Sequence, residues 1–293
     1  MLFSSAINDK IISMKYIDSK IYKDERALFM SEDLFIQNSV FEDGESPLKE
    51  SKNIELHNCE FRWKYPLWYV NKVKCHNVTW KESARSGVWY TNHIEIYDSN
   101  IYAPKQFRRC ENIKLVNVKI PNAQETLWMC KGFRAVNIEV NGDYFGMNSE
   151  NIEIDKLVLS GNYAFDGGKN IIVRDSILKS KDSFWNCENV TLINCEIDGE
   201  YIGWNTKNLT LINCKVRSHQ GFCYVENLNL IDCEVNESDL CFEYCKNIDA
   251  RINSVVDSIK NPYSGRIVVK GVNQLILESD KVDIRQTEII IRG

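Results

Sequence analysis

The sequence has few of the residues that interrupt regular structure and few that carry most enzyme chemistry. Its 293 residues include only five prolines, 14 glycines and four histidines. So little proline and glycine excludes collagen-like and linker-like chains. The sequence also lacks a P-loop, a dinucleotide-binding fingerprint, an HExxH zinc motif and a GxSxG nucleophile motif. No reaction is therefore identified by motif.

Long apolar runs and a positive charge balance are lacking as well. No apolar run approaches the ~18–20 residues that cross a membrane, and the N-terminus does not resemble a secretory signal. The 41 acidic residues outnumber the 36 basic ones, which argues against general binding to nucleic acid. With 44% hydrophobic residues a packed core is expected. We expect a cytoplasmic protein with no membrane and no nucleic-acid partner, and the oligomeric state stays open.

A nine-residue phrase recurs along most of the chain. Clear copies, such as NVTLINCEI from Asn189, begin at Asn53, Asn112, Asn170, Asn189, Asn208 and Asn227. Weaker copies begin at Asp33, Lys72, His93, Gly132, Asn151 and Asn247. The steps between the 12 copies are 19 to 21 residues long. Such a constant period is typical of a solenoid with one coil per copy.

The pattern within each copy predicts strands that meet at a corner. When the first residue is counted as position 0, positions 1 and 3 are mostly apolar, and so are positions 6 and 8. This alternation is the strand period of two. Position 5 is Asn or Asp in ten of the 12 copies. These residues tolerate the backbone of a tight corner, and stacked amides can pair along a column.

Other repeat architectures do not fit this period. Helical solenoids need roughly 33–47 residues per repeat, and the leucine spacing of leucine-rich repeats is missing. The sequence therefore predicts an all-β fold, a single-stranded right-handed parallel β-helix of about 12 coils with ~19-residue repeats. We expect one domain over residues 1–293, with an N-terminal cap at 1–32, regular coils at 33–255 and a C-terminal cap at 256–293.

The register also places eight of the eleven cysteines in two columns. Cys59, Cys195, Cys214 and Cys233 share position 6, and a second column contains Cys110, Cys130, Cys187 and Cys245. Buried thiols behave as small hydrophobic groups, and such columns suit stacked coils in a reducing compartment. Metal binding is the alternative, but no CxxC pair supports it.

Two columns follow in the second half of each coil. The first is mostly large and apolar and is predicted to face inward: Leu67, Val88, Phe107, Leu127, Gly146, Phe165, Phe184, Gly203, Phe222 and Phe242. The next is predicted to face outward: Trp68, Trp89, Arg108, Trp128, Met147, Asp166, Trp185, Trp204, Cys223 and Glu243. An outward tryptophan row suits stacking on the apolar faces of sugars. The alternative is that the rings serve packing alone.

Charged residues near this row supply the candidate site. Asp166, Asp182, Glu200 and Glu125 are the acid/base candidates, while Lys105, Arg108, Arg109 and Lys181 would recognise an anionic group. Trp128, Trp185 and Trp204 would form a stacking platform. Carboxylates on neighbouring coils ~4.8 Å apart could reach the ~5–9.5 Å separations of glycoside hydrolases. The alternatives are salt bridges on a solvated face, or Ca²⁺ held by the carboxylates; no other cofactor is expected.

The histidines add little at this level. His57 and His76 share position 4 on neighbouring coils, so we expect them to stack at an exposed turn. Two ligands do not make a metal site, and none is predicted. His219 lies in the aromatic half of its coil and is either catalytic or incidental.

Ten stretches carry a family resemblance: ERALF (25–29), GESPLKES (44–51), WKYPLWY (63–69), ARSGVWY (84–90), APKQFRR (103–109), ETLW (125–128), GNYAFDGGKN (161–170), SKDSFWNCENV (180–190), GEYIGWN (199–205) and CFEYC (241–245). With them the chain resembles the bacterial domain-of-unknown-function family 3737 over nearly its whole length. The resemblance implies a single-domain right-handed β-helix similar in shape to pectate lyases and polygalacturonases. It implies no reaction, because the family has no established one and fold does not imply function.

The leading hypothesis is a carbohydrate-active β-helix, a hydrolase or lyase that acts on an oligosaccharide. The alternative is a non-catalytic carbohydrate-binding or structural scaffold protein that uses the same face. The adjacent aspartates of the polygalacturonase acid signature are missing, which argues against hydrolysis of galacturonan.

Overall fold

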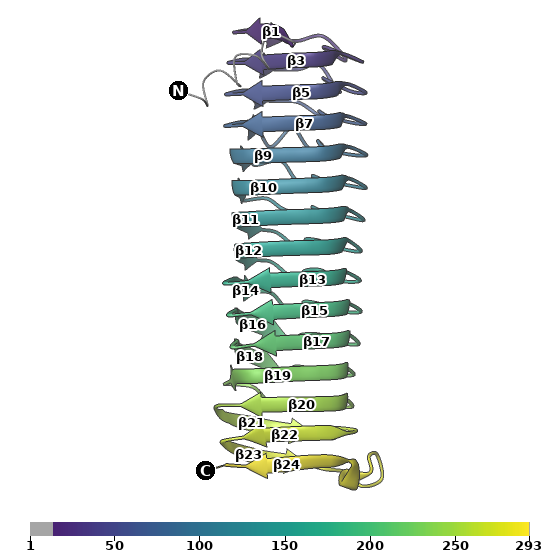
Figure 1. The fold of residues 1–293 in the computed structure, drawn as a ribbon, viewed down its shortest axis with the longest axis vertical. Coiled ribbons are helices and arrows are strands. Elements are labelled where there is room, and N and C mark those ends of the chain that lie inside the picture. Colours follow the sequence, from purple (N-terminus) through teal and green to yellow (C-terminus); the bar gives the residue numbers. More distant parts are fainter. Residues whose placement is uncertain (1–13, 293) are drawn as a thin grey trace, which may run out of the picture. The chain divides into compact units, whose positions relative to one another are not determined.

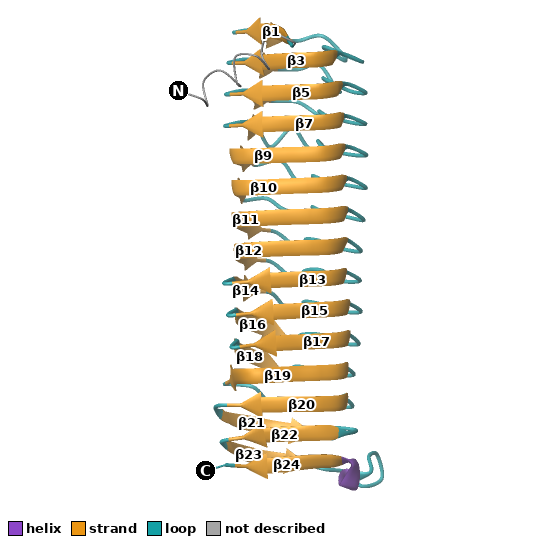
Figure 2. Cartoon of the chain, in the orientation of Figure 1, coloured by secondary structure: helices purple, strands orange, loops and turns teal. Residues whose placement is uncertain are grey.

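The structure is a computed structural model that describes residues 14–292. These residues form two compact units, 14–141 and 142–292. In each unit parallel strands lie one above the other, and every coil adds a level to the stack (Figure 1). The only helix within residues 14–292 is the short 3₁₀ turn η1 (Ile284–Gln286) (Figure 2). No helix in that range has the length and apolar character of a membrane span.

The first unit contains eleven strands. They are β1 (Lys15–Asp18), β2 (Ile21–Tyr22), β3 (Glu32–Gln37), β4 (Val40–Phe41), β5 (Lys52–His57), β6 (Glu60–Phe61), β7 (Asn71–His76), β8 (Thr79–Trp80), β9 (Asn92–Ile101), β10 (Glu111–Ile120) and β11 (Lys131–Asn141).

The second unit contains thirteen strands. They are β12 (Glu150–Ser160), β13 (Lys169–Arg174), β14 (Ile177–Lys179), β15 (Glu188–Ile193), β16 (Glu196–Glu200), β17 (Lys207–Ile212), β18 (Lys215–His219), β19 (Glu226–Val235), β20 (Lys246–Ile252), β21 (Val255–Lys260), β22 (Gly265–Val269), β23 (Gly271–Ile276) and β24 (Thr287–Ile291).

The repeat period sets the register of neighbouring strands. On β15 and β17, for example, Val190 pairs with Leu209 and Leu192 with Leu211, 19 residues apart. Each of the 12 predicted copies begins one residue after the start of a strand, from β3 to β20. The predicted all-β parallel solenoid with ~19-residue repeats is therefore confirmed.

The predicted number of coils is too low. Residues 14–292 form about 15 turns, because β1 pairs with β3, β22 with β20 and β24 with β22. These additional coils lie in segments assigned to the caps, where side chains and spacing depart from the repeated phrase while backbone pairing continues. Residues 1–13 of the predicted N-terminal cap lie outside the described residues. The division into one domain with two caps stays a prediction.

Positive backbone φ angles mark two corners of each regular coil. Position 0 and position 5 have φ near +50 to +70° in all copies from Asp33 to Asn227, and Asn247 has it at position 0. Asn and Asp are enriched at these positions because they adopt the left-handed backbone at less cost than most side chains. The predicted corner at position 5 is confirmed, and position 0 is a second corner of the same kind.

Side-chain amides form ladders at these corners. In the second unit one ladder runs through Asn151, Asn170, Asn189, Asn208, Asn227 and Asn247 with hydrogen bonds of 2.7–3.0 Å. In every bond Nδ2 donates to Oδ1 of the residue one coil earlier. The ladders therefore have a direction.

This direction explains where aspartate occurs. A carboxylate accepts hydrogen bonds but cannot donate one, so Asp can only be the first member of such a ladder. Asp18 and Asp98 begin ladders in the first unit, and Asp175 begins one in the second. Asn194 donates to Asp175 at 2.9 Å and accepts from Asn213 at 2.9 Å.

The core lies inside the coils. Every member of the predicted inward column is buried, including Phe165 and Phe184, whose rings stack 5.3 Å apart. All eleven cysteines are free and buried, which confirms the burial predicted for the eight cysteines of the two columns. The thiols of the eight column cysteines donate to carbonyl oxygens of the preceding coil, as from Cys214 Sγ to Leu192 O at 3.4 Å. The cysteine columns therefore satisfy polar atoms as well as packing.

The direction of the amide ladder can be tested with a charge swap. Asn194→Asp should lower the free energy of unfolding by about 1–2 kcal/mol, because a donor is lost and a second carboxylate faces Asp175. Asp175→Asn should change it by less than about 0.5 kcal/mol. The double variant should regain most of the loss, because the amide introduced at position 175 can then donate to the carboxylate introduced at position 194. Urea unfolding of the four proteins measures this, and additive effects would contradict a directed ladder.

Candidate functional site

The tryptophan column of the first unit forms a continuous stack with one arginine. The rings of Trp68 and Trp89 are parallel within 5°, with centroids 5.1 Å apart. The Arg108 guanidinium then lies 4.7 Å from the Trp89 ring and 4.6 Å from the Trp128 ring. The indole nitrogens of Trp68 and Trp89 donate to backbone carbonyls at 2.6 and 2.8 Å. Because the ring faces cover one another, this stack presents mainly ring edges to solvent.

Arg108 also joins a cluster of predicted site residues. Glu125 lies 3.1 Å from Lys105 Nζ and 3.3 Å from Arg108 Nη2. The neighbouring Arg109 is exposed, and its backbone N–H donates to Trp128 O at 2.9 Å. The structure thus brings Lys105, Arg108, Glu125 and Trp128 together, but as an ion-paired group in which the carboxylate faces two cations.

The second unit has a row of aromatic rings with one ring per coil. It contains Trp185, Trp204, Tyr224, Tyr244 and Tyr263, with centroids 5.9, 5.1, 5.2 and 5.2 Å apart. Successive rings are tilted by 38–44° and so do not cover one another fully. We call these five residues the aromatic row.

Two members of the predicted outward column are buried instead. Cys223 is fully buried and Glu243 is 6% exposed. Glu243 can be buried because it pairs with Lys260 at 2.8 Å and accepts from Gln220. The row therefore continues one position later, through Tyr224 and Tyr244. The tryptophan spacing does not predict this shift, because Tyr224 and Tyr244 lie one position after the tryptophan column.

A shallow groove lies on the outward side of β14, β16 and β18. One part has a volume of about 330 Å³ and the other about 340 Å³, and both are wide open to solvent. Lys179, Asp198 and Arg217 line both parts, and Lys181, Gly199, Glu200, Ser218 and His219 line the first. We call this the β16–β18 groove. Gly199 allows a close approach of coils, since a Cβ there would lie 2.0 Å from Ser180 O.

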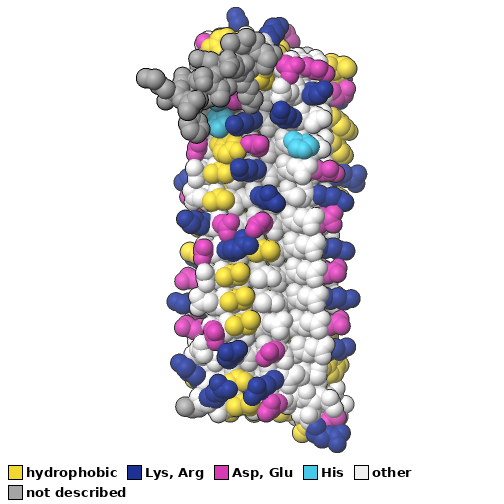
Figure 3. Space-filling view, in the orientation of Figure 1, with side chains coloured by type: hydrophobic (Ala, Val, Ile, Leu, Met, Phe, Trp, Pro, Cys, Tyr) yellow, Lys and Arg dark blue, Asp and Glu magenta, His cyan; other side chains and the backbone are white. Residues whose placement is uncertain are grey.

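Ion pairs and hydrogen bonds join neighbouring coils along the groove. Lys181 Nζ lies 2.9 Å from Glu200, and His219 Nδ1 lies 2.7 Å from Asp239. Arg217 forms ion pairs with Asp198 and Glu237. The hydrogen bond from Arg217 lowers the pKa of Asp198, and the bond to Glu200 raises the pKa of Lys181. Charged side chains of both signs are interspersed over the face in Figure 3.

Asp182 lies beside this groove in a different environment. Its side chain is buried, and its backbone N–H donates to Glu200 O at 2.8 Å. Burial, and next the charge of Glu200, raises the pKa of the Asp182 carboxyl. The charge of Asp182 in turn raises the pKa of Tyr163. Asp182 is thus a buried carboxyl with a raised pKa beside the carboxyl group of Glu200.

Asp166 has a different position from Asp182 and Glu200. It accepts a hydrogen bond from Asn186 Nδ2 at 3.1 Å, and Asn186 accepts one from Asn205. Asp166 is therefore the first member of a third amide ladder. Among the predicted residues of the second unit, the structure gathers Lys181, Asp182 and Glu200 at the groove, with Trp185 and Trp204 in the aromatic row.

Several groove residues were not predicted. Asp198 and Arg217 follow Lys179 at intervals of 19 residues, and Asp239 follows His219 after 20. This spacing is the feature of the sequence that indicates a charged row. It does not by itself predict a site, because charges on a repeated strand also form ordinary surface ion pairs. Tyr201 was also missed, although its ring contacts those of Trp204 and His219, with centroids 5.8 and 6.0 Å away.

His57 and His76 form a third group, in the first unit. Their rings stack 4.8 Å apart, as predicted, but they lie half-buried at the ends of β5 and β7 rather than at an exposed turn. The prediction of an exposed turn was wrong because position 4 is the last residue of the strand. Phe35 and Tyr97 extend the ring stack on either side.

The comparison with protein families accounts for nearly the whole chain. The family described as a protein of unknown function, DUF3737, matches residues 15–290. The chain belongs to this family. The resemblance found in the sequence is confirmed, and membership in DUF3737 assigns no reaction.

Solved structures show more distant likenesses. A crystal structure of PfbA, a surface adhesin of Streptococcus pneumoniae, is 10% identical over 84% of this chain and 87% of that one, with a TM-score of 0.49. QnrB1, a plasmid-mediated fluoroquinolone resistance protein, is 11% identical over 68% of this chain and 91% of that one, with a TM-score of 0.29. No curated protein matches the sequence of this chain.

The sandwiched arginine of the first unit makes a testable contribution to stability. Arg108→Lys should lower the free energy of unfolding by about 1–2 kcal/mol, because an ammonium cannot stack in a plane between two indoles. Arg109→Lys is the matched control and should change it by less than about 0.5 kcal/mol. Denaturant unfolding compares the two, and equal effects would show that the stack does not depend on guanidinium planarity.

The environment of Asp182 predicts a pH-dependent effect. Its pKa in the folded protein is raised above the ordinary value of 3.8, so the unfolded chain loses this proton first as pH rises. Wild-type stability should therefore fall as pH rises from the pKa of Asp182 in the unfolded chain to its pKa in the folded protein. The whole of this loss of stability should persist at neutral pH. Asp182→Asn removes the charge and keeps nearly the same side-chain volume. We expect the variant to equal or exceed wild-type stability at neutral pH, by up to about 1 kcal/mol.

Urea unfolding at several pH values measures this difference. The stability gain of Asp182→Asn over wild type should shrink as pH falls from the folded-state pKa toward the unfolded-state pKa. It should vanish below the ordinary carboxyl pKa. A variant that is less stable than wild type at neutral pH would mean that the ionised carboxylate stabilises the fold.

Proposed function

We propose that the protein is a non-catalytic carbohydrate-binding solenoid. The aromatic row and the β16–β18 groove would together hold an extended oligosaccharide. The observation that carries this proposal is the row itself, which offers one ring per coil over five successive coils of the second unit. A surface that repeats at each coil suits a ligand that repeats along its own chain.

The tilt of the rings supports this use. In the Trp–Arg stack of the first unit the ring faces of Trp68 and Trp89 are parallel and covered. In the aromatic row Tyr224 is 44% exposed and Tyr263 is 37% exposed. Accessible faces of this kind suit the apolar face of a sugar ring, while the phenol hydroxyl can hydrogen-bond to its edge.

The groove supplies complementary polar groups. Tyr201 contacts both Trp204 and His219 and so connects the aromatic row to the groove. Because the charged groups form pairs of opposite sign, the surface offers many donors and acceptors without a strong net charge. Such a lining fits the hydroxyl groups of a neutral or weakly charged sugar chain better than a highly charged polyanion.

A hydrolase is the second candidate, favoured by one observation. Asp182, with its raised pKa, lies next to Glu200, and a carboxylic acid beside a carboxylate is the pair that glycoside hydrolysis requires. Against it, Glu200 is ion-paired with Lys181, and the groove is too open to exclude water from a reaction. We therefore place binding first.

A glycan array with the full chain, followed by calorimetry on the best oligosaccharide, tests the proposal. Tyr224→Ala should weaken binding at least tenfold, which corresponds to about 1.4 kcal/mol. Tyr69→Ala is the matched control, because Tyr69 is 49% exposed and belongs to the first unit; it should bind like wild type.

Product analysis of the same mixtures separates the two candidates. Intact oligosaccharide after prolonged incubation is expected. Cleavage by wild type that is lost in Asp182→Asn would establish the hydrolase instead. Failure of the wild-type protein to bind any oligosaccharide, or equal weakening by both tyrosine variants, would refute the proposed surface.

A further inference from the structure

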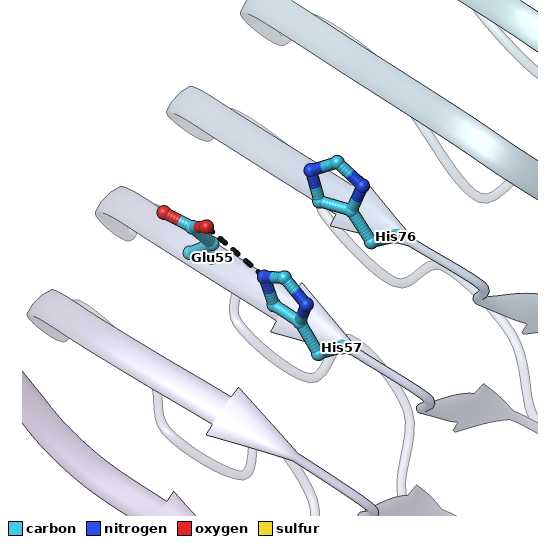
Figure 4. Close-up of side chains that lie close together, drawn as sticks. All are labelled: Glu55, His57 and His76. Atoms are coloured by element: carbon cyan, nitrogen blue, oxygen red, sulfur yellow. Dashed lines mark hydrogen bonds and ion pairs between the residues drawn. The ribbon is translucent and has the colours of Figure 1, made fainter. Parts of the chain in front are cut away.

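Three potential metal ligands meet on the outward face of β5 and β7. Glu55 and His57 lie two residues apart on β5, so their side chains emerge on the same side of the sheet. His76 is the in-register partner of His57 on β7. The ligand atoms of the three side chains all lie within 4.8 Å of one another. Figure 4 shows the carboxylate and the two imidazoles extending from neighbouring strands toward the same side.

We propose that Glu55, His57 and His76 form a binding site for a divalent transition-metal ion, with Zn²⁺ as the ion that suits them best. Two imidazole nitrogens and one carboxylate oxygen are a ligand set that Zn²⁺ takes in proteins, with water in the fourth position. Ca²⁺ and Mg²⁺ prefer six or more oxygen ligands, and this cluster offers one carboxylate. The site belongs to the first unit and is independent of the carbohydrate surface.

The distances require a small adjustment. Neighbouring ligands of a tetrahedral Zn²⁺ are about 3.3 Å apart, given metal–ligand bonds near 2.0–2.1 Å. Glu55 Oε1 and His57 Nε2 are already 3.0 Å apart. His76 must therefore approach this pair, which it can do by tilting its ring out of the stack with His57, where the planes already differ by 22°. Within residues 14–292 no hydrogen bond fixes either nitrogen of His76.

The surroundings leave the site accessible and its ligands oriented. The side chains of His57 and Glu55 are 30% and 15% exposed, so an ion can enter from solvent and be partly dehydrated. Phe35 packs against His57 at 4.8 Å and Tyr97 against His76 at 4.7 Å. These rings hold the imidazoles on neighbouring levels of one column.

Two neighbouring charged groups are directed toward Tyr97. The Lys74 ammonium, on the same face of β7, lies 5.5 Å from the centroid of the Tyr97 ring. The Glu95 carboxylate is hydrogen-bonded to the Tyr97 hydroxyl at 2.6 Å. Lys74 is also the in-register partner of Glu55 on β7, so its ammonium is the cationic group nearest the proposed site by register.

Calorimetric titration of the metal-free full chain with Zn²⁺ tests the site. We expect one ion per chain for the wild type. His57→Asn, His76→Asn and Glu55→Gln should each weaken binding at least tenfold. His93→Asn is the matched control and should bind like wild type, because His93 lies at a position-0 corner with φ of 56°, where other copies have Asn.

Thermal unfolding with and without Zn²⁺ gives a second readout and checks folding. An ion that binds only the folded protein raises the unfolding midpoint by mass action. The midpoint should rise for wild type and His93→Asn and stay unchanged for the three ligand variants, whose metal-free proteins should unfold cooperatively. Lack of stoichiometric binding by the wild type would overturn the proposal. Full binding by His76→Asn would also overturn it, because two ligands on one strand would then suffice.

Discussion

Parallel backbone pairing between successive coils is the constraint on which the rest of the structure depends. Strands in register lie ~4.8 Å apart, so a residue and its counterpart 19 positions later are direct neighbours in space. Each side chain then has residues of its own column as its neighbours on the adjacent coils. A position that tolerates one type of residue in one coil favours the same or a complementary type in the next.

Different columns meet this constraint by different interactions. Amides can both donate and accept, so asparagine repeats without limit along a corner, whereas aspartate can only begin a ladder. Aromatic rings stack with their neighbours. Like charges on neighbouring coils are unfavourable, and Lys179, Asp198 and Arg217 alternate in sign along β14, β16 and β18 instead. Each column is therefore made of residue types that interact favourably with the same or a complementary type on the next coil.

The candidate sites are consequences of the same geometry. Residues far apart in the sequence, such as Lys181, Glu200 and His219, become a contiguous row because they occupy one column of neighbouring coils. Glu55, His57 and His76 converge because a strand period of two and a coil period of 19 place them on one face. A solenoid of this kind builds open, repetitive surfaces more readily than deep pockets, which favours binding of extended ligands over enclosed chemistry.

Periodicity alone determined the strand register, the corners at position 5, the inward cysteine and phenylalanine columns and the stack of His57 on His76. It could do so because each of these depends only on which residues recur at one spacing. The extra coils beyond the clear repeats, the shift of the aromatic row to Tyr224 and the pairing of Glu125 with two cations were decided by tertiary structure. So were the burial of Asp182 and the meeting of Glu55 with both histidines. These features depend on the lateral distance between columns and on the direction of individual side chains, which a repeat period does not contain.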